Sequence, residues 1–178
     1  RVLAEPAVRA AVAGYFDADD PEPIAEAVLG LVAAAGLRAG EEPWLAELTL
    51  TGADGEFYPA GELLLPGSPL HQIMAADAPF GTVAPDLVER WGEQTLEAAG
   101  VLRGFAVARA EDVDVAALAD EPLLELDGEE EWARYVLDLL GPQELPPQLP
   151  ELVAVRDLEL VEDWPAALRL LAEPPLRA

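Results

Sequence analysis

Apolar and polar residues follow one another along this chain in patterns that predict short strands mixed with helices. Residues 44–50 alternate, with Trp44, Ala46, Leu48 and Leu50 on one side, and so have the period of a half-buried strand. Asp54-Gly55 follows as a hairpin signal, because a type I′ turn requires positive φ. We expect the return strand at Phe57-Tyr58 to be short or at an edge, since Pro59 has no N–H to donate.

Two segments have the spacing of an amphipathic helix. Residues 21–35 lie between an N-cap at Asp20 and a glycine C-cap at Gly36, with apolar side chains at Ile24, Val28, Leu31, Val32 and Ala35. Residues 129–140 have the same kind of stripe, formed by Trp132, Tyr135, Val136, Leu139 and Leu140. Each stripe is predicted to be the face by which its helix packs on the core.

The other predicted elements are shorter. Helices are expected at 7–16, 70–74, 85–91, 93–99 and 112–119, and after an N-cap at Asp163. Strands are expected at 101–108 and 152–161, and residues 62–65 fit either a strand or one helical turn. The four prolines within 142–150 predict an extended linker.

These elements predict an α+β fold with short, mostly antiparallel strands and several packed helices. Strands and helices do not alternate regularly, so the chain does not have the pattern of a doubly wound fold. At 178 residues the chain has the length of one domain or of two small ones. We expect a single domain over 1–178, with a candidate subdomain junction in the proline-rich segment 142–150.

Charge and composition narrow the choice of partners. The formal net charge is −25, and all ten basic residues are arginines. This charge repels phosphate backbones and anionic lipid, so neither nucleic acid nor a membrane is an expected partner. The acidity favours a basic partner or a cation, or it simply reflects the amino-acid usage of a GC-rich genome, which is the preferred interpretation. The chain has no cysteine, which fits a reducing, cytoplasmic compartment.

No motif selects a catalytic site. A phosphate-binding loop that ends in lysine is excluded because the chain has no lysine. Ser68 and His71 are the only serine and the only histidine, and we interpret them as a loop serine and a surface or packed histidine rather than as a nucleophile–base pair. The four tryptophans, Trp44, Trp91, Trp132 and Trp164, are interpreted as core anchors rather than as a carbohydrate- or peptide-binding platform.

The acidic clusters also have simpler explanations than a metal site. Asp17, Asp19 and Asp20 resemble the start of a calcium loop, but Glu22 and Val28 stand where that loop needs a glycine and a closing glutamate. We therefore favour a helix N-cap cluster. Asp112, Asp114 and the acids of 125–131 are expected on solvated surfaces, where the latter also interact favourably with a helix dipole.

The segment around the hairpin has a recognisable order of residues. The Asp54-Gly55 turn is followed by Pro59, then by Glu62-Leu63, and later by Asp77-Ala78-Pro79-Phe80. This order resembles a pattern in sacsin-like proteins. Segments 66–70, 89–92, 100–105 and 158–171 are likewise similar to the middle region of actinobacterial proteins with a sacsin-type, Hsp90-like ATP-binding domain at their N-terminus. The resemblance covers most of the chain through short, structural motifs.

The resemblance implies that this chain, which begins with Arg1, is a non-catalytic piece of a longer ATPase. ATP and Mg would then bind only to a domain upstream in the same polypeptide. The ATP site of such families uses an asparagine-bearing helix and an Asp-x-Gly-x-Gly motif, but this chain has no asparagine, and Asp77 to Gly81 has a different spacing. No catalytic, cofactor or metal residue is therefore assigned. The implied role is to relay nucleotide state from the ATP-binding domain or to bind a protein client.

Within this motif we favour structural roles over contact with a ligand by the 77–81 loop. Asp54-Gly55 provides the turn, Pro59 ends the strand, and Leu63–Leu65 and Phe80 are expected to be buried. Two functions of other classes stay open from the sequence: an acidic hydrolase that uses a carboxylate pair, and a module that binds a cation or a basic protein.

Overall fold

A computed structural model of the chain describes residues 22–124, 126, 128–141 and 148–173. The chain divides into two compact units, one comprising Arg1–Phe105 with Glu159–Ala178 and the other Ala106–Leu158. Both boundaries lie outside the 142–150 segment that was expected as a subdomain junction. The predicted helix at 7–16 and the Asp17–Asp20 cluster lie outside the described residues.

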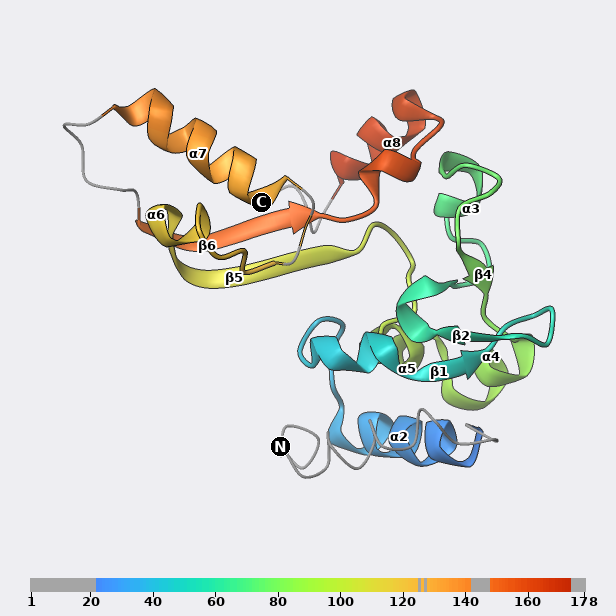
Figure 1. Cartoon of the computed structure of the whole chain (residues 1–178). Coiled ribbons are helices and arrows are strands. Elements are labelled where there is room, and N and C mark those ends of the chain that lie inside the picture. The colour runs from blue at the N-terminus through green and yellow to red at the C-terminus, as the bar shows by residue number, and fades with distance from the viewer. Residues whose placement is uncertain (1–21, 125, 127, 142–147, 174–178) are drawn as a thin grey trace. The chain divides into compact units, whose positions relative to one another are not determined.

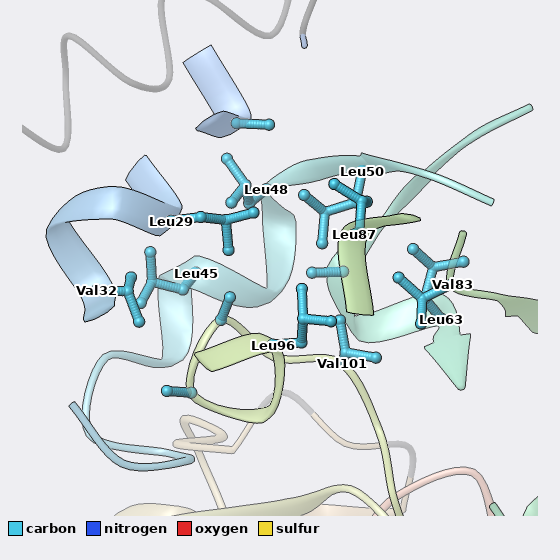
Figure 2. Packing of buried hydrophobic residues seen from close by; sticks show 14 of the residues in the cluster. Leu29, Val32, Leu45, Leu48, Leu50, Leu63, Val83, Leu87, Leu96 and Val101 are labelled. Carbon is cyan, nitrogen blue, oxygen red and sulfur yellow. The ribbon is translucent and has the colours of Figure 1, made fainter. Parts of the chain in front are cut away.

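The core of the first unit forms where one long helix covers a set of short elements. Helix α2 (Glu22–Ala35), the 3₁₀ helix η1 (Pro43–Glu47), strand β1 (Thr49–Thr51), and helices α4 (Pro85–Trp91) and α5 (Glu93–Ala98) each contribute buried apolar side chains. Figure 2 shows Leu29 of α2, Leu45 of η1 and Leu96 of α5 pointing into this common interior. Their burial supplies the main stabilisation of the unit.

Helix α2 forms as predicted, but only Val28 and Val32 of the predicted stripe are among its buried residues. Its buried residues are Ala25, Val28, Leu29 and Val32, whereas Leu31 is exposed. The predicted stripe was centred about one residue away from the buried one. Both sets satisfy a three-to-four-residue spacing because the helix is apolar nearly all round, so periodicity alone does not choose between them.

The predicted strand at 44–50 is wrong in its first half. Residues Pro43–Glu47 form a 3₁₀ helix, and strand β1 begins only at Thr49. A proline at the start of η1 has no N–H to pair, which suits the first turn of a helix. As a result Leu45, which alternation placed on the outer face, is fully buried.

Strands β1 and β2 (Phe57–Pro59) form the predicted hairpin, but its turn is not type I′. The strands are antiparallel, with Leu50 opposite Tyr58. Gly55 has a φ of 86°, and Asp54 is not among the residues with positive φ. A type I′ turn needs positive φ at both central positions, so the single left-handed glycine is instead typical of a three-residue loop with a bulge.

A second strand pair, two 3₁₀ turns and the helices α3 and α8 complete the described part of the first unit. Strand β3 (Leu63–Leu64) follows the 3₁₀ turn η2 (Ala60–Glu62) and pairs in parallel with β4 (Gly81–Thr82). Helices α3 (Leu70–Ile73), α4 and α5 confirm the predictions for those segments. Near the C-terminus, η3 (Leu158–Leu160) precedes α8 (Trp164–Leu171), whose N-cap Asp163 accepts the Ala166 amide as its sequence predicted.

The second unit is a long strand pair covered by two helices, as Figure 1 shows for α7 above β5 and β6. Strands β5 (Val107–Asp114) and β6 (Gln148–Val155) are antiparallel. Helices α6 (Val115–Leu118) and α7 (Glu129–Leu140) pack on them around Val113, Leu118 and Ala133. This core is small, because four of the described residues in the cluster are fully buried.

Several boundaries in the second half differ from the prediction. Residues 101–106 do not form a strand, and β5 instead runs through Asp112, where a helix was expected to begin. Asp114 is the N-cap of α6 and accepts the amides of Ala116 and Ala117. Strand β6 begins at Gln148, inside the predicted linker, and ends at Val155 rather than at 161. The strand pair extends over the proline at 150 because an edge strand tolerates it.

The α+β class is confirmed: two of the three described strand pairs are short, and two of the three are antiparallel. The searched part of the chain contains no helix with the length and apolar character needed to cross a membrane.

Candidate functional site

Asp54 stabilises the tip of the β1–β2 hairpin through two hydrogen bonds. Its carboxylate accepts the Tyr58 hydroxyl at 2.6 Å and the Glu56 amide at 3.0 Å. The bond from Tyr58, followed by the bond from Glu56, lowers the pKa of Asp54, and the same bond to Asp54 raises the pKa of Tyr58. At neutral pH the pair is therefore a carboxylate and a neutral phenol that fix the turn.

The position of the Tyr58 ring also explains why glycine occupies two nearby positions, 52 and 81. A Cβ at Gly52 would lie 2.8 Å from the ring atom Cε2 of Tyr58, and one at Gly81 would lie 3.1 Å from the same atom. Because the ring occupies the space of both side chains, only glycine fits there without a shift. The Ala53 amide donates to the Thr82 carbonyl at 2.7 Å, so the hairpin and β4 are joined along their backbones.

The residues of the sequence motif are only partly brought together. Leu63 lies opposite Gly81 in the parallel pair, next to the hairpin that carries Asp54, Gly55 and Pro59. Glu62, Asp77 and Pro79 are exposed. Leu63–Leu65 are buried as expected, but Phe80 is only half-buried, so that part of the expectation was wrong. The motif as a whole forms backbone turns and strand contacts.

Ser68 and His71 are not arranged as a nucleophile and its base. The Ser68 hydroxyl donates to the Arg103 carbonyl at 2.8 Å and accepts the Leu70 amide at 3.3 Å. Its proton is therefore engaged by a backbone oxygen. His71 is exposed on α3. Ser68 acts as a buried link between its loop and the segment that follows α5.

A polar groove of about 290 Å³ lies among α2, β1 and α4. It is lined by Glu22, Glu26, Asp86 and Arg90, among others. Arg90 forms ion pairs with both Glu26 and Asp86, and the Thr51 hydroxyl donates to Glu22 at 3.4 Å. Arg90 thus pairs with two of the groove's three carboxylates. The described residues contain no group of three or more acids or histidines that could hold a metal ion.

Glu129 is a buried carboxylate with a structural role. It was expected on a solvated surface, but only 7% of it is exposed. Its two oxygens accept the backbone amides of Leu123, Leu124 and Leu126, at 2.7–3.3 Å. Among the described residues it is the one buried acid.

The outer face of α7 is the most unusual surface of the second unit. Trp132, Tyr135 and Leu139 stand at i, i+3 and i+7, and they are 40%, 61% and 68% exposed. We call these three residues the α7 stripe. The helix packs on its own unit through Ala133, Val136 and Leu137 instead. Helix α7 therefore has two apolar faces, of which the predicted one is largely in solvent.

Two of the four tryptophans are core anchors and two are not. Trp44 and Trp91 pack against the core of the first unit. Trp132 on α7 and Trp164 at the start of α8 are 40% and 45% exposed, which corrects the expectation for both. Trp164 and Leu168 are exposed on one side of α8, whereas Ala167 of the same helix is buried.

A signal for the α7 stripe was present in the sequence but was assigned to the wrong face. The 129–140 segment also contains Ala133 and Leu137, which form a second apolar stripe at i and i+4. A helix that presents this second stripe to its core can leave its aromatic residues outside. Only the packing of Ala133 with Val113, Val115 and Leu118 in the core of the unit decides between the two faces.

No family model, no curated protein and no solved structure matches the chain.

Proposed function

We propose that this chain is a non-catalytic domain that binds a protein partner, and that the α7 stripe is the surface that binds. The observation that carries the proposal is the exposure of Trp132, Tyr135 and Leu139 on one side of a single helix. Contiguous exposed apolar residues of this kind are typical of interaction sites. Tryptophan and tyrosine are also the residue types that contribute most to binding free energy at interfaces.

The energetics of burial support this surface. Covering a large apolar side chain contributes about 1.5–3 kcal/mol. Three such anchors offset the loss of translational and rotational freedom on association, which costs at least about 4 kcal/mol. The anchors alone therefore support a weak affinity, in the millimolar to sub-millimolar range, and a tighter complex needs further contacts beside them. Such an affinity suits a domain that exchanges partners rather than one that is permanently assembled.

The wider context of the chain is part of the same proposal. We infer that it belongs to a longer, cytoplasmic sacsin- or Hsp90-like ATPase, in which a separate upstream domain binds ATP and Mg. The support is the resemblance carried by Asp54-Gly55, Pro59, Glu62-Leu63 and Asp77–Phe80. In that setting the chain relays nucleotide state to the partner that it holds, and it neither binds nor hydrolyses ATP itself.

The proposal is tested by selecting binders with the whole chain. A displayed library of random peptides is panned against residues 1–178, and the selected peptides are titrated against Trp132→Ala and Trp164→Ala. The two substitutions remove tryptophans of similar exposure, 40% and 45%, from different helices. We expect Trp132→Ala to weaken binding by about tenfold or more and Trp164→Ala to leave it unchanged. Selected peptides that bind both variants equally would refute the assignment of the surface.

A further inference from the structure

We propose that the partner of the α7 stripe is a basic amphipathic helix. This inference rests on the proposed function, and it adds the chemistry of the partner. Glu131 and Asp138 stand at i−4 and i+3 from Tyr135, so they border the stripe along one side of the helix. The stripe therefore presents apolar anchors with a row of carboxylates beside them.

The single basic residue of α7 does not neutralise this row. Arg134 forms ion pairs with Glu130 at 2.6 Å and with Glu131 at 3.8 Å. The Glu131 side chain nevertheless remains 74% exposed. Asp138 is also exposed. Both carboxylates are thus accessible to a cation carried by a partner.

The rest of the second unit strengthens the same field. Residues 106–158 contain 14 acids and three arginines, and the whole chain carries a net charge of −25. A surface potential of this sign accelerates the encounter with a cationic partner and opposes an anionic one. Two copies of this chain would bring like charges together around their stripes, so a second copy is a poorer occupant than a basic segment.

The spacing of the stripe favours a helical partner. From Trp132 to Leu139 the helix rises by about 10 Å, which is two turns. A partner helix with apolar residues at i, i+3 or i+4, and i+7 covers that length with matching anchors. Arginine or lysine beside those anchors would then lie next to Glu131 and Asp138. The partner is therefore a protein segment with both an apolar face and a basic flank.

Two peptides of about sixteen residues test this inference against the whole chain. Both have tryptophan and leucine at helical spacing; one has arginine at its flanking positions, and the other has glutamate there. Binding is measured by calorimetry at low and at high salt. We expect the cationic peptide to bind at least about tenfold more tightly than the anionic one, and its affinity to fall by about three- to tenfold at high salt.

Charge variants distinguish the contribution of Glu131 and Asp138 to binding from that of the apolar α7 stripe. The double variant Glu131→Gln with Asp138→Asn removes the row, and the matched double variant Asp77→Asn with Glu89→Gln removes two exposed acids from the first unit. We expect the first double variant to lower the affinity for the cationic peptide by about three- to tenfold. The second double variant should leave that affinity unchanged. Circular dichroism spectra that match the parent chain exclude loss of folding as the cause.

The other outcomes overturn the inference in distinguishable ways. If both peptides bind equally and Trp132→Ala abolishes both, the basic partner is wrong while the α7 stripe stays the binding surface. If neither peptide binds, or if binding survives Trp132→Ala, the proposed function fails as well. If sedimentation shows a dimer that Trp132→Ala converts to a monomer, the occupant is a second copy of the chain.

Discussion

The backbone amide of Leu124 donates to both carboxylate oxygens of Glu129, each at 3.0 Å. Together with the amides of Leu123 and Leu126, this contact closes the connection between α6 and α7 around one buried carboxylate. Hydrogen bonds to a charged acceptor are stronger than those between neutral groups. The position of α7, and with it the α7 stripe, depends on Glu129.

Replacing Glu129 by glutamine is expected to destabilise the second unit by about 2–3 kcal/mol. Glutamine keeps the length of the side chain but replaces one acceptor oxygen by an NH₂ group that faces backbone donors. Urea denaturation, followed by hydrogen exchange of the 123–126 segment, measures the effect. Glu130→Gln is the matched control: it loses an exposed ion pair with Arg134 and should cost less than about 1 kcal/mol. Equal effects of both variants would contradict the role of Glu129.

Because of the Tyr58–Asp54 hydrogen bond, we expect the difference in unfolding free energy between the parent chain and Tyr58→Phe to depend on pH in both the acidic and the alkaline range. The folded pKa of Asp54 is lowered, so its contribution is present above the unfolded value and is lost as the pH falls through the folded value. The folded pKa of Tyr58 is raised, so its contribution is present below the unfolded value and is lost as the pH rises through the folded value. The parent chain is therefore expected to exceed Tyr58→Phe in unfolding free energy by a constant amount between about pH 5 and pH 9. The difference should become smaller below and above this range.

Carboxyl NMR titration gives a direct check of this pair. In Tyr58→Phe the pKa of Asp54 should rise toward its ordinary value. Tyr135→Phe changes an exposed tyrosine on α7 and serves as the control. An Asp54 pKa that is the same in the parent chain and in both variants would show that the bond does not form in solution.

Gly100 is predicted to be the most sensitive glycine next to the core. Its φ is 107°, and a Cβ placed there would lie 2.7 Å from the Cα of Ala46. Because the clash is with backbone, it cannot be relieved by a side-chain rotation. Gly100→Ala should cost about 2–5 kcal/mol of unfolding free energy, whereas Gly104→Ala meets nothing within 4 Å and should cost less than about 1 kcal/mol. Thermal or urea unfolding that gives similar values for both would contradict this packing.

The sequence was sufficient for the elements whose signals are local. Helix α7, the Asp163 cap and the Asp54-Gly55 hairpin depend on capping residues, turn residues and strong periodicity within one segment. The prediction failed where a distant neighbour decides. Residues 44–47 alternate like a strand but form η1, and Leu45 becomes buried because α2 covers it. Strand β5 pairs with β6, which begins 34 residues after β5 ends. A local sequence pattern cannot reveal such a distant pairing.

For the candidate site, too, local sequence patterns did not determine which residues face the core. The sequence located the apolar residues of α7, but it did not show that Ala133 and Leu137 face the core and that Trp132 and Tyr135 face solvent. Glu129 was also indistinguishable from its neighbours Glu130 and Glu131 until the position of the Leu124 amide was known. Structural roles were predicted for the motif residues from Asp54 to Phe80; Asp54 accepts hydrogen bonds from the Tyr58 hydroxyl and the Glu56 amide, whereas Glu62, Asp77 and Pro79 are exposed.

Removal of Trp132 is expected to have little effect on stability. A tryptophan in the core costs about 3–5 kcal/mol when it is replaced by alanine, whereas an exposed one costs much less. Trp132→Ala should therefore change the free energy of unfolding by less than about 1 kcal/mol. Trp91→Ala, on the packed face of α4, should cost several times more. A large loss of stability in Trp132→Ala would mean that this side chain is part of the core, as the sequence first indicated.

Hydrogen exchange of the whole chain, with and without the cationic peptide, shows whether the α7 stripe binds a protein segment. The small core of the second unit allows α7 to open, and a bound partner should suppress that opening. We expect slower exchange over residues 129–140 and unchanged exchange over 164–171. Unchanged exchange in 129–140 at saturating peptide, or slowing confined to α2 and α4, would contradict this expectation.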